Sequence, residues 1–118
     1  MAGSVRTIVY TERIKISPSD MRLFQAGRKK CTVRLGVARV AKSEMFLSDG
    51  RKNVPVRITR VDSSRCFRDL TDQDALDEGF SKREELLADL RHYYPRARDE
   101  DRVTVIHFEP VNPQPTLF

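Results

Sequence analysis

Apolar and polar residues alternate along several stretches of the chain, and a period of two is typical of β-strands. The alternation predicts strands in 7–16, in 31–35 and in 102–111. It also predicts two strands within 44–61, joined by a turn at Asp49–Gly50, a dipeptide that favours hairpins. The pattern therefore indicates a chain rich in strands.

Three segments carry signals for helices, and each begins with a serine or threonine suited to be its N-cap. The first is expected within 17–27, where Pro18 follows the cap, and the others within 71–79 and 81–94. The first two end at a glycine, and the third ends before a proline. Strands outnumber helices, and the helices fall in two separate places. An α+β fold, with a small barrel-like mixed sheet and flanking helices, therefore fits better than a parallel βαβ fold.

Length and composition predict one globular domain, because the chain has 118 residues, 39% of them hydrophobic and 33% charged. We expect residues 1–111 to form this domain and residues 112–118 to be a flexible tail. No apolar run approaches the roughly 20 residues that a membrane span requires. The first residues lack the basic-then-apolar order of a signal peptide. The sequence therefore predicts a cytoplasmic protein without a membrane partner.

The cysteines and histidines offer little basis for a metal site. Cys31, Cys66, His92 and His107 are scattered along the chain without the spacing of metal ligands. In the absence of a secretion signal, the two cysteines are expected to be buried free thiols rather than a disulfide. The sequence therefore predicts no metal and no cofactor.

Charge is distributed unevenly along the chain, whose formal net charge is +5. Residues 21–43 contain seven Lys or Arg and no acid, whereas residues 69–89 contain eight acids against Lys82 and Arg83. A basic half that faces an acidic half suggests a polar ligand, such as a phosphate or nucleotide, on the basic side. Two solvated faces of opposite sign would explain the same pattern.

The stretch "GRKKCTVRLG", residues 27–36, carries the candidate chemistry. Alternation in the strand places Thr32 and Arg34 on one face. A threonine becomes a nucleophile when a neighbouring base takes its proton, and Lys29 or Lys30 could be that base if crowding by other cations kept it neutral. Arg34 could then bind an oxyanion or a phosphate. Spacing does not decide between the two lysines, and the same residues suit an ordinary solvated strand face.

Four segments in this order resemble the ASCH domain family: "AGRKKCTVRLG", "RDLTDQDALDEGF", a helix that ends in "YYP", and "VTVIHFEPV". The likeness extends from about Phe24 to Val111. It implies a PUA-like β-barrel with a cleft around a G-x-K-x-x-T-x-R motif, here residues 27–34, and with RNA or nucleotides as ligands. The stretch 42–54 is longer than this resemblance leads us to expect and, as a loop at the barrel rim, could reshape the mouth of the cleft.

The resemblance also implies an activity, because small bacterial members of the family are amidohydrolases that act on N(4)-acetylcytidine. The motif places their lysine at Lys29 and their threonine at Thr32, and the glutamate after an "LT-x-x-x-A" segment falls on Glu78. Thr32 would be the nucleophile, neutral Lys29 its base, and Glu78 would hold the lysine or pass a proton to the leaving amine. Arg34 and Arg28 would bind the substrate, a small acylated cytidine or modified nucleoside. Read without the resemblance, Glu78 is an exposed acid at a helix end.

Two other functions are compatible with the sequence. The basic stretch could hold phosphates while Tyr93 and Tyr94 stack on bases, as in a non-catalytic RNA- or nucleotide-binding module. A nuclease would need a general acid and base, and His92 and His107 are candidates by residue type only.

The last residues suggest a separate interaction. "QPTLF" resembles the Q-x-x-L-F peptide with which bacterial proteins bind the sliding clamp, and its anchors here would be Gln114, Leu117 and Phe118. A short exposed peptide with two apolar anchors suits a pocket on a partner protein. The alternative is a tail without a partner.

Overall fold

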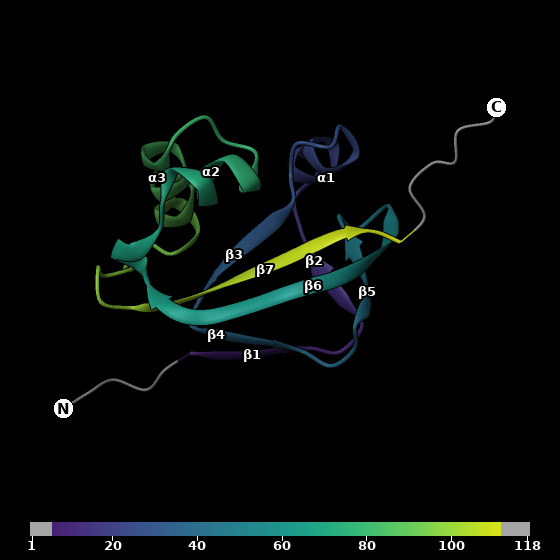
Figure 1. Cartoon of the computed structure of the whole chain (residues 1–118), viewed down its shortest axis with the longest axis horizontal. Helices are drawn as coiled ribbons and strands as arrows, with labels where there is room; N and C mark the ends of the chain where they lie inside the picture. Colours follow the sequence, from purple (N-terminus) through teal and green to yellow (C-terminus); the bar gives the residue numbers. More distant parts are fainter. Residues whose placement is uncertain (1–5, 112–118) are drawn as a thin grey trace.

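A computed structural model describes residues 6–111, and Figure 1 shows the arrangement of its elements. The expected flexible tail and the clamp-type residues Gln114, Leu117 and Phe118 lie outside the described residues. The elements in chain order are β1 (Thr7–Tyr10), β2 (Arg13–Lys15), α1 (Pro18–Gln25), β3 (Cys31–Leu35), β4 (Val37–Val40), β5 (Glu44–Ser48), β6 (Asn53–Cys66), the 3₁₀-helix η1 (Phe67–Asp69), α2 (Asp72–Glu78), α3 (Arg83–Tyr93) and β7 (Arg102–Pro110).

The described strands form one sheet of five strands, in the order β2-β5-β6-β7-β3, and one sheet of two, β1-β4. The central strand β6 has 14 residues and pairs antiparallel with both β5 and β7. The expected hairpin around Asp49–Gly50 and the expected strand at 31–35 are confirmed, and the strand at 102–111 is confirmed to within one residue. Strand β4 was not expected, and it pairs in parallel with β1.

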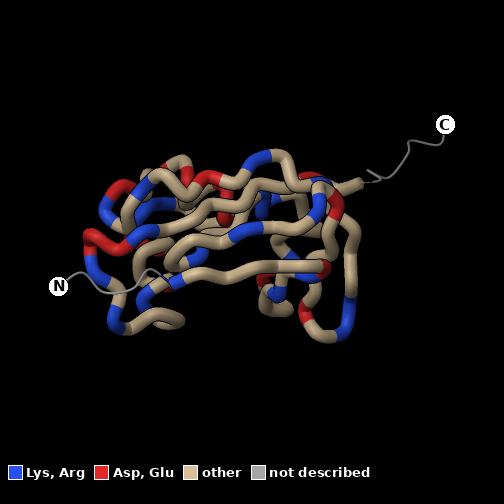
Figure 2. Tube along the Cα trace, turned by 90° about the horizontal axis from the view of Figure 1, so that it is seen from below, with Lys and Arg blue, Asp and Glu red and all other residues tan. Residues whose placement is uncertain are grey.

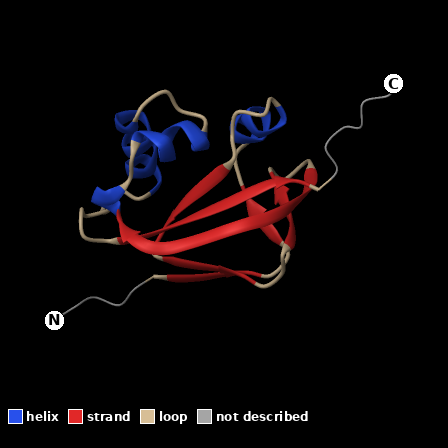
Figure 3. Ribbon diagram, in the orientation of Figure 1, coloured by secondary structure: helices blue, strands red, loops and turns tan. Residues whose placement is uncertain are grey.

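All three helices lie on one side of β3, β6 and β7, while β1 and β4 lie on the other side (Figures 1 and 3). Helix α1 begins as predicted, because the Ser17 side chain accepts a hydrogen bond from the Asp20 N–H at 3.0 Å. The expected cap of α3 is wrong: Lys82 precedes the helix, and the Ser81 N–H instead donates to Glu85 Oε1 at 2.8 Å.

The hydrophobic core has two clusters, and strand β7 contributes to both. Val103 and Val105 pack with residues of β3, α2 and α3, whereas Ile106 and Phe108 pack with residues of β2, β5 and α1. Phe108 meets Phe24 edge-on, with 5.7 Å between the ring centroids. One cluster therefore lies beneath α1, and the other lies beneath α2 and α3.

The closed barrel expected from the sequence is not present within residues 6–111, where the ladders form two separate sheets. The buried side chain of Thr104 in β7 joins the small sheet to the large one in place of a ladder. Its hydroxyl donates to the Gly36 carbonyl at 2.8 Å and accepts from the Ala38 N–H at 2.9 Å. The fold is thus a mixed α+β fold in which side-chain hydrogen bonds cross the seam between the sheets.

Folding mixes the charges that are separated along the sequence. Figure 2 shows Lys and Arg, and also Asp and Glu, at both ends of the molecule. The expected division into a basic half and an acidic half is therefore not seen in space. The charge that a ligand meets therefore differs from one pocket to another.

Candidate active site

The turn that carries Lys29 is held between two helices. Gly27 adopts a left-handed conformation (φ +76°) at the end of α1, a conformation that glycine adopts at little cost. After it, the Lys29 N–H donates to the Leu23 carbonyl at 3.2 Å, and the Lys30 N–H donates to the Asp77 carbonyl at 2.6 Å. These bonds bring the turn against the last residues of α2. As a result Lys29 is only 1% exposed, whereas Lys30 points to solvent.

Helix α2 is anchored at its first turn, and this anchoring positions Glu78 at its other end. Thr71 and Asp74 form a reciprocal capping box, with N–H to oxygen distances of 3.1 and 2.8 Å. Arg65 of β6 donates two hydrogen bonds to the Asp74 carboxylate, at 2.7 and 3.0 Å. Burial alone would raise the pKa of Asp74, but the hydrogen bonds from Arg65 and Thr71 outweigh it and lower the pKa. The α2 helix is thus tied to the sheet.

Lys29 and Glu78 form a buried ion pair. Lys29 Nζ donates to Glu78 Oε1, and the Val33 N–H of β3 donates to Glu78 Oε2 at 2.8 Å. Glu78 is 5% exposed, so its interpretation as an exposed acid at a helix end is wrong. Burial raises the pKa of the Glu78 carboxyl, although Lys29 and the Val33 N–H act in the opposite direction. The ion pair is therefore held in a site where burial makes two charges costly.

Thr32 and Arg34 lie on the same face of β3 and line a pocket of about 450 Å³ between α1 and α3. The hydroxyl of Thr32, a residue only 2% exposed, makes no hydrogen bond within residues 6–111. Arg34 is fixed by two hydrogen bonds, from Nε to the Tyr10 hydroxyl at 3.0 Å and from Nη2 to the Lys15 carbonyl at 2.7 Å. Its Nη1 makes no hydrogen bond to a described residue. We call this cavity the Thr32 pocket.

The structure does not bring every expected residue to this pocket. Glu78 lines it, and Lys29 lies one layer further in, paired with Glu78. Arg28 does not line the pocket, because it lies in the exposed part of the turn after Gly27. Neither His92 nor His107 lines it. The arrangement therefore supports Lys29, Thr32, Glu78 and Arg34 as one site and leaves Arg28 outside it.

Three further carboxylates line the Thr32 pocket, and no sequence pattern predicts their role: Asp20 of α1, Asp49 of the hairpin turn and Asp89 of α3. They converge only through the fold, because they come from distant segments. Burial raises the pKa of Asp89, and the negative charge of Asp20 raises it further. Glu78 also lines the pocket, but its charge is balanced by Lys29, so these three carboxylates face the two cations Lys15 and Arg34. The pocket is therefore acidic.

Comparison with solved structures gives the same fold in three proteins. The crystal structure of an ASCH domain from Lactobacillus crispatus JV V101 superposes with a TM-score of 0.64, at 14% identity, over 86% of this chain and 80% of that one. The chain has the fold of an ASCH domain. Hypothetical protein PH0355 follows with a TM-score of 0.62 at 17% identity, over 86% of this chain and 99% of that one. Protein EF3133 from Enterococcus faecalis V583 has a TM-score of 0.54 at 17% identity, over 90% of this chain and 76% of that one.

Sequence comparison adds nothing to this ASCH fold: no protein-family model matches the chain, and no curated protein is significantly similar to it. No helix in residues 6–111 is long and apolar enough to cross a membrane. Within the same range, no three His, Cys, Asp or Glu side chains are grouped so that they could hold a metal ion. Both cysteines are free thiols; Cys31 is buried, which raises its pKa, and Cys66 is half-buried rather than buried as expected.

Proposed function

We propose that the Thr32 pocket is the active site of an amidohydrolase that removes the acyl group from N(4)-acetylcytidine-type nucleosides. One observation carries this proposal: a threonine hydroxyl without a described protein partner lines the same pocket as Glu78, whose carboxylate is paired with the buried Lys29. A nucleophilic hydroxyl needs a base of this kind close by. The ASCH fold and the G-x-K-x-x-T-x-R motif support the same assignment.

The Lys29–Glu78 pair acts as the base in this proposal. Lys29 accepts a proton only when its amine is neutral, and it becomes neutral when its proton passes to Glu78 Oε1. Burial, which raises the pKa of Glu78, favours this uncharged form of the pair. The structure shows no hydrogen bond from Thr32 to either residue, and the proposed mechanism requires the Thr32 hydroxyl to turn toward the pair when the substrate binds. Such contacts often tighten only in the substrate complex.

The first half of the reaction transfers the acyl group to Thr32. The Thr32 proton moves to Lys29 Nζ as Oγ1 attacks the acyl carbon, and the carbonyl oxygen becomes an oxyanion that Arg34 stabilises. The C–N bond then breaks as Glu78 gives its proton to the exocyclic nitrogen, which releases cytidine. The products in the site are an acyl ester on Thr32 and the charged pair of Lys29 ammonium and Glu78 carboxylate.

The second half regenerates the site. A water molecule gives a proton to the Glu78 carboxylate and attacks the ester carbon, and the bond to Thr32 Oγ1 breaks as Lys29 returns its proton to that oxygen. Acetic acid leaves, and the uncharged pair is restored. Each proton taken up in one half is returned in the other, so the cycle needs no cofactor.

The size and charge of the pocket favour a nucleoside over a phosphate-bearing substrate. A cavity of about 450 Å³ is in the range of small-molecule sites. Its carboxylates can accept hydrogen bonds from ribose hydroxyls and base N–H groups, whereas they repel phosphate. This charge argues against RNA phosphates in the Thr32 pocket.

The test is incubation of the protein with N(4)-acetylcytidine and chromatographic detection of cytidine. Thr32→Val removes the nucleophile at nearly constant shape, and we expect a loss of about 10³-fold or more in kcat. Glu78→Gln keeps an acceptor for Lys29 but cannot carry the proton, and we expect a loss of about 10²- to 10⁴-fold. Lys30→Met is the matched control and should retain activity.

Two results would contradict this function. One is a wild-type protein that binds the nucleoside without turnover, which would support the binding module instead. The other is a folded Thr32→Val variant with undiminished activity, which would exclude threonine as the nucleophile. Circular dichroism of each variant shows whether it is folded.

A further inference from the structure

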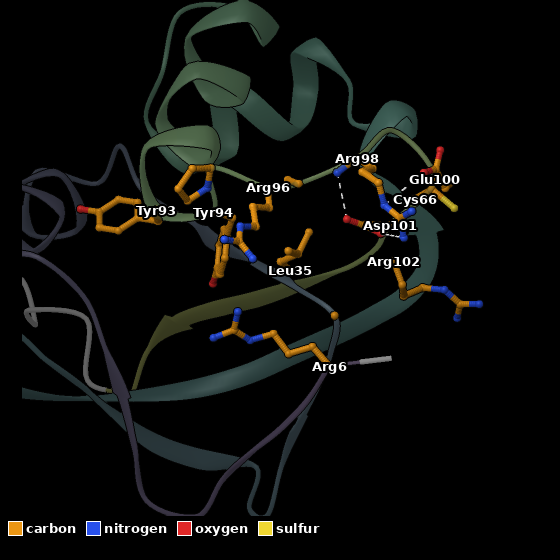
Figure 4. A pocket seen from close by; sticks show the side chains of 13 residues that line it. Arg6, Leu35, Cys66, Tyr93, Tyr94, Arg96, Arg98, Glu100, Asp101 and Arg102 are labelled. Carbon is orange, nitrogen blue, oxygen red and sulfur yellow. Dashed lines mark hydrogen bonds and ion pairs between the residues drawn. The ribbon is translucent and has the colours of Figure 1, made fainter. Parts of the chain in front are cut away.

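A second cavity, of about 800 Å³, lies beyond the C-terminal end of α3 (Figure 4). The segment 95–102 forms one wall, and Leu35, Gly36 and Arg6 form another. It shares only Tyr93 and Tyr94 with the Thr32 pocket. Because its charged lining includes Arg6, Arg96, Arg98 and Arg102, we call it the arginine pocket.

Most of the positive charge in the arginine pocket has no counter-charge in the described part of the chain. The two carboxylates that line it, Glu100 and Asp101, are both ion-paired with Arg98, at 3.3 and 3.4 Å. Arg6 and Arg96 form no ion pair with a described residue, and Arg102 only donates one hydrogen bond to a backbone carbonyl. The cavity therefore has a local excess of two positive charges, and an anion would relieve their repulsion.

Arg6 is close to an aromatic ring that also lines the cavity. The Arg6 guanidinium carbon lies 5.2 Å from the centre of the Tyr94 ring, within the range of a cation–π contact. Arg96 lines the same cavity as Arg6 and Tyr94 (Figure 4). Tyr93, which is 59% exposed, and Leu35 extend the apolar surface. The cavity thus combines guanidinium groups with rings on which a flat group can pack.

The backbone position of Arg6 is fixed by the start of β4. The Val37 N–H donates to the Arg6 carbonyl at 2.7 Å. Gly36 has φ +90°, and a Cβ atom added there would lie 2.3 Å from the Arg6 carbonyl oxygen. A glycine is therefore required for this close approach. These contacts hold the backbone of Arg6 at the edge of the cavity, from which its side chain extends.

We propose that the arginine pocket binds a nucleoside monophosphate. The Arg6 and Arg96 guanidinium groups hold its phosphate, because their paired N–H donors match phosphate oxygens. The base packs against the exposed ring of Tyr93, as bases do on aromatic side chains, while Tyr94 supports the Arg6 guanidinium. A volume of about 800 Å³ accommodates such a ligand. This site is separate from the Thr32 pocket and does not depend on hydrolysis there.

The test is a calorimetric titration of the full chain with cytidine 5′-monophosphate, cytidine and inorganic phosphate. We expect the monophosphate to bind more tightly than either part alone. Arg96→Ala and Arg6→Ala should each weaken it about 10- to 100-fold, because each removes a charge-assisted hydrogen bond. Arg39→Ala, an exposed arginine outside both pockets, is the control and should change nothing.

Several outcomes would overturn the proposal. Unchanged monophosphate affinity in Arg96→Ala and Arg6→Ala would remove the arginines from the site. Cytidine that binds as tightly as its monophosphate would exclude phosphate recognition. A single-stranded oligonucleotide that binds more tightly, and in an Arg96-dependent way, would reassign the site to nucleic acid. If Arg6→Ala does not fold, Arg6→Gln replaces it, since glutamine retains the aliphatic stem.

The same titration in Thr32→Val separates this proposal from the amidohydrolase. We expect the Thr32→Val variant to bind the monophosphate like the wild type, because Thr32 does not line the arginine pocket. A monophosphate affinity lost in Thr32→Val would place the ligand in the Thr32 pocket and overturn the second site. Failure of acylcytidine hydrolysis would leave the titration result unaffected.

Discussion

The two pockets meet at Tyr93 and Tyr94 but have opposite charge. Apart from Glu78, which is paired with Lys29, the Thr32 pocket has three carboxylates against two cations, and the arginine pocket has four arginines against two carboxylates. The basic stretch 21–43 contributes only Arg34 to the charged lining of either pocket. The charge of a site therefore depends on which distant residues the fold brings together, and a basic stretch of sequence does not locate it.

The largest expected effect concerns the one cation buried beneath the acidic pocket. Lys29→Met leaves the buried Glu78 carboxylate without its partner, and we expect a loss of about 3 to 5 kcal/mol in the free energy of unfolding at pH 8. Lys30→Met removes the exposed neighbouring lysine and should change stability by less than about 0.5 kcal/mol. Urea unfolding of both variants measures the difference.

The pH dependence of Lys29→Met provides a second criterion. Without Lys29, the pKa of folded Glu78 rises further above its unfolded value, so the folded state holds the proton more tightly. Stability is then highest below the unfolded pKa and falls as pH rises through the folded pKa. The free energy of unfolding that Lys29→Met loses relative to the wild type should therefore be smaller at pH 5 than at pH 8. A loss independent of pH would show that its cause is lost packing and not charge.

The sequence predicted most of the local structure around the Thr32 pocket. Ser17 and Thr71 are capping residues whose hydrogen bonds are local, so the starts of α1 and α2 could be predicted. The alternation in 31–35 correctly placed Thr32 and Arg34 on one face. The choice of Lys29 over Lys30 came from the family resemblance alone, since spacing carries no information on which lysine is buried.

The remaining features depend on contacts between distant segments. Strand β4 pairs in parallel with β1, and the register of this pairing is not encoded in either strand alone. The closed barrel was not found: the backbone ladders form two separate sheets, and the Thr104 side chain makes hydrogen bonds between them. The convergence of Asp20 with Asp89, and the exclusion of Arg28, likewise follow from how α1 and α3 are placed.

A smaller effect tests whether the acidic lining excludes phosphate. The double variant Asp20→Asn and Asp89→Asn removes two of the three carboxylates that line the pocket without a lysine partner. We expect kcat/KM for N(4)-acetylcytidine 5′-monophosphate, relative to the nucleoside, to rise about 3- to 10-fold, because each removed charge is worth about 1 kcal/mol or less across a solvated cavity. Glu84→Gln, an exposed acid on α3, is the control. An unchanged ratio would mean that shape, not charge, determines the preference.

The smallest expected effect is a shift in the titration of Asp89. Burial and the charge of Asp20 both raise the pKa of Asp89, so Asp20→Asn should lower that pKa while the contribution of burial remains. A carboxyl with a raised pKa costs the folded state stability as pH rises through that pKa, so Asp20→Asn should lose less stability between pH 3 and pH 7 than the wild type. Carbon-13 NMR of the carboxyl groups measures the pKa directly. An Asp89 pKa that does not change would show that Asp20 and Asp89 do not interact across the Thr32 pocket. Solvent would then screen the carboxylates of the pocket from one another.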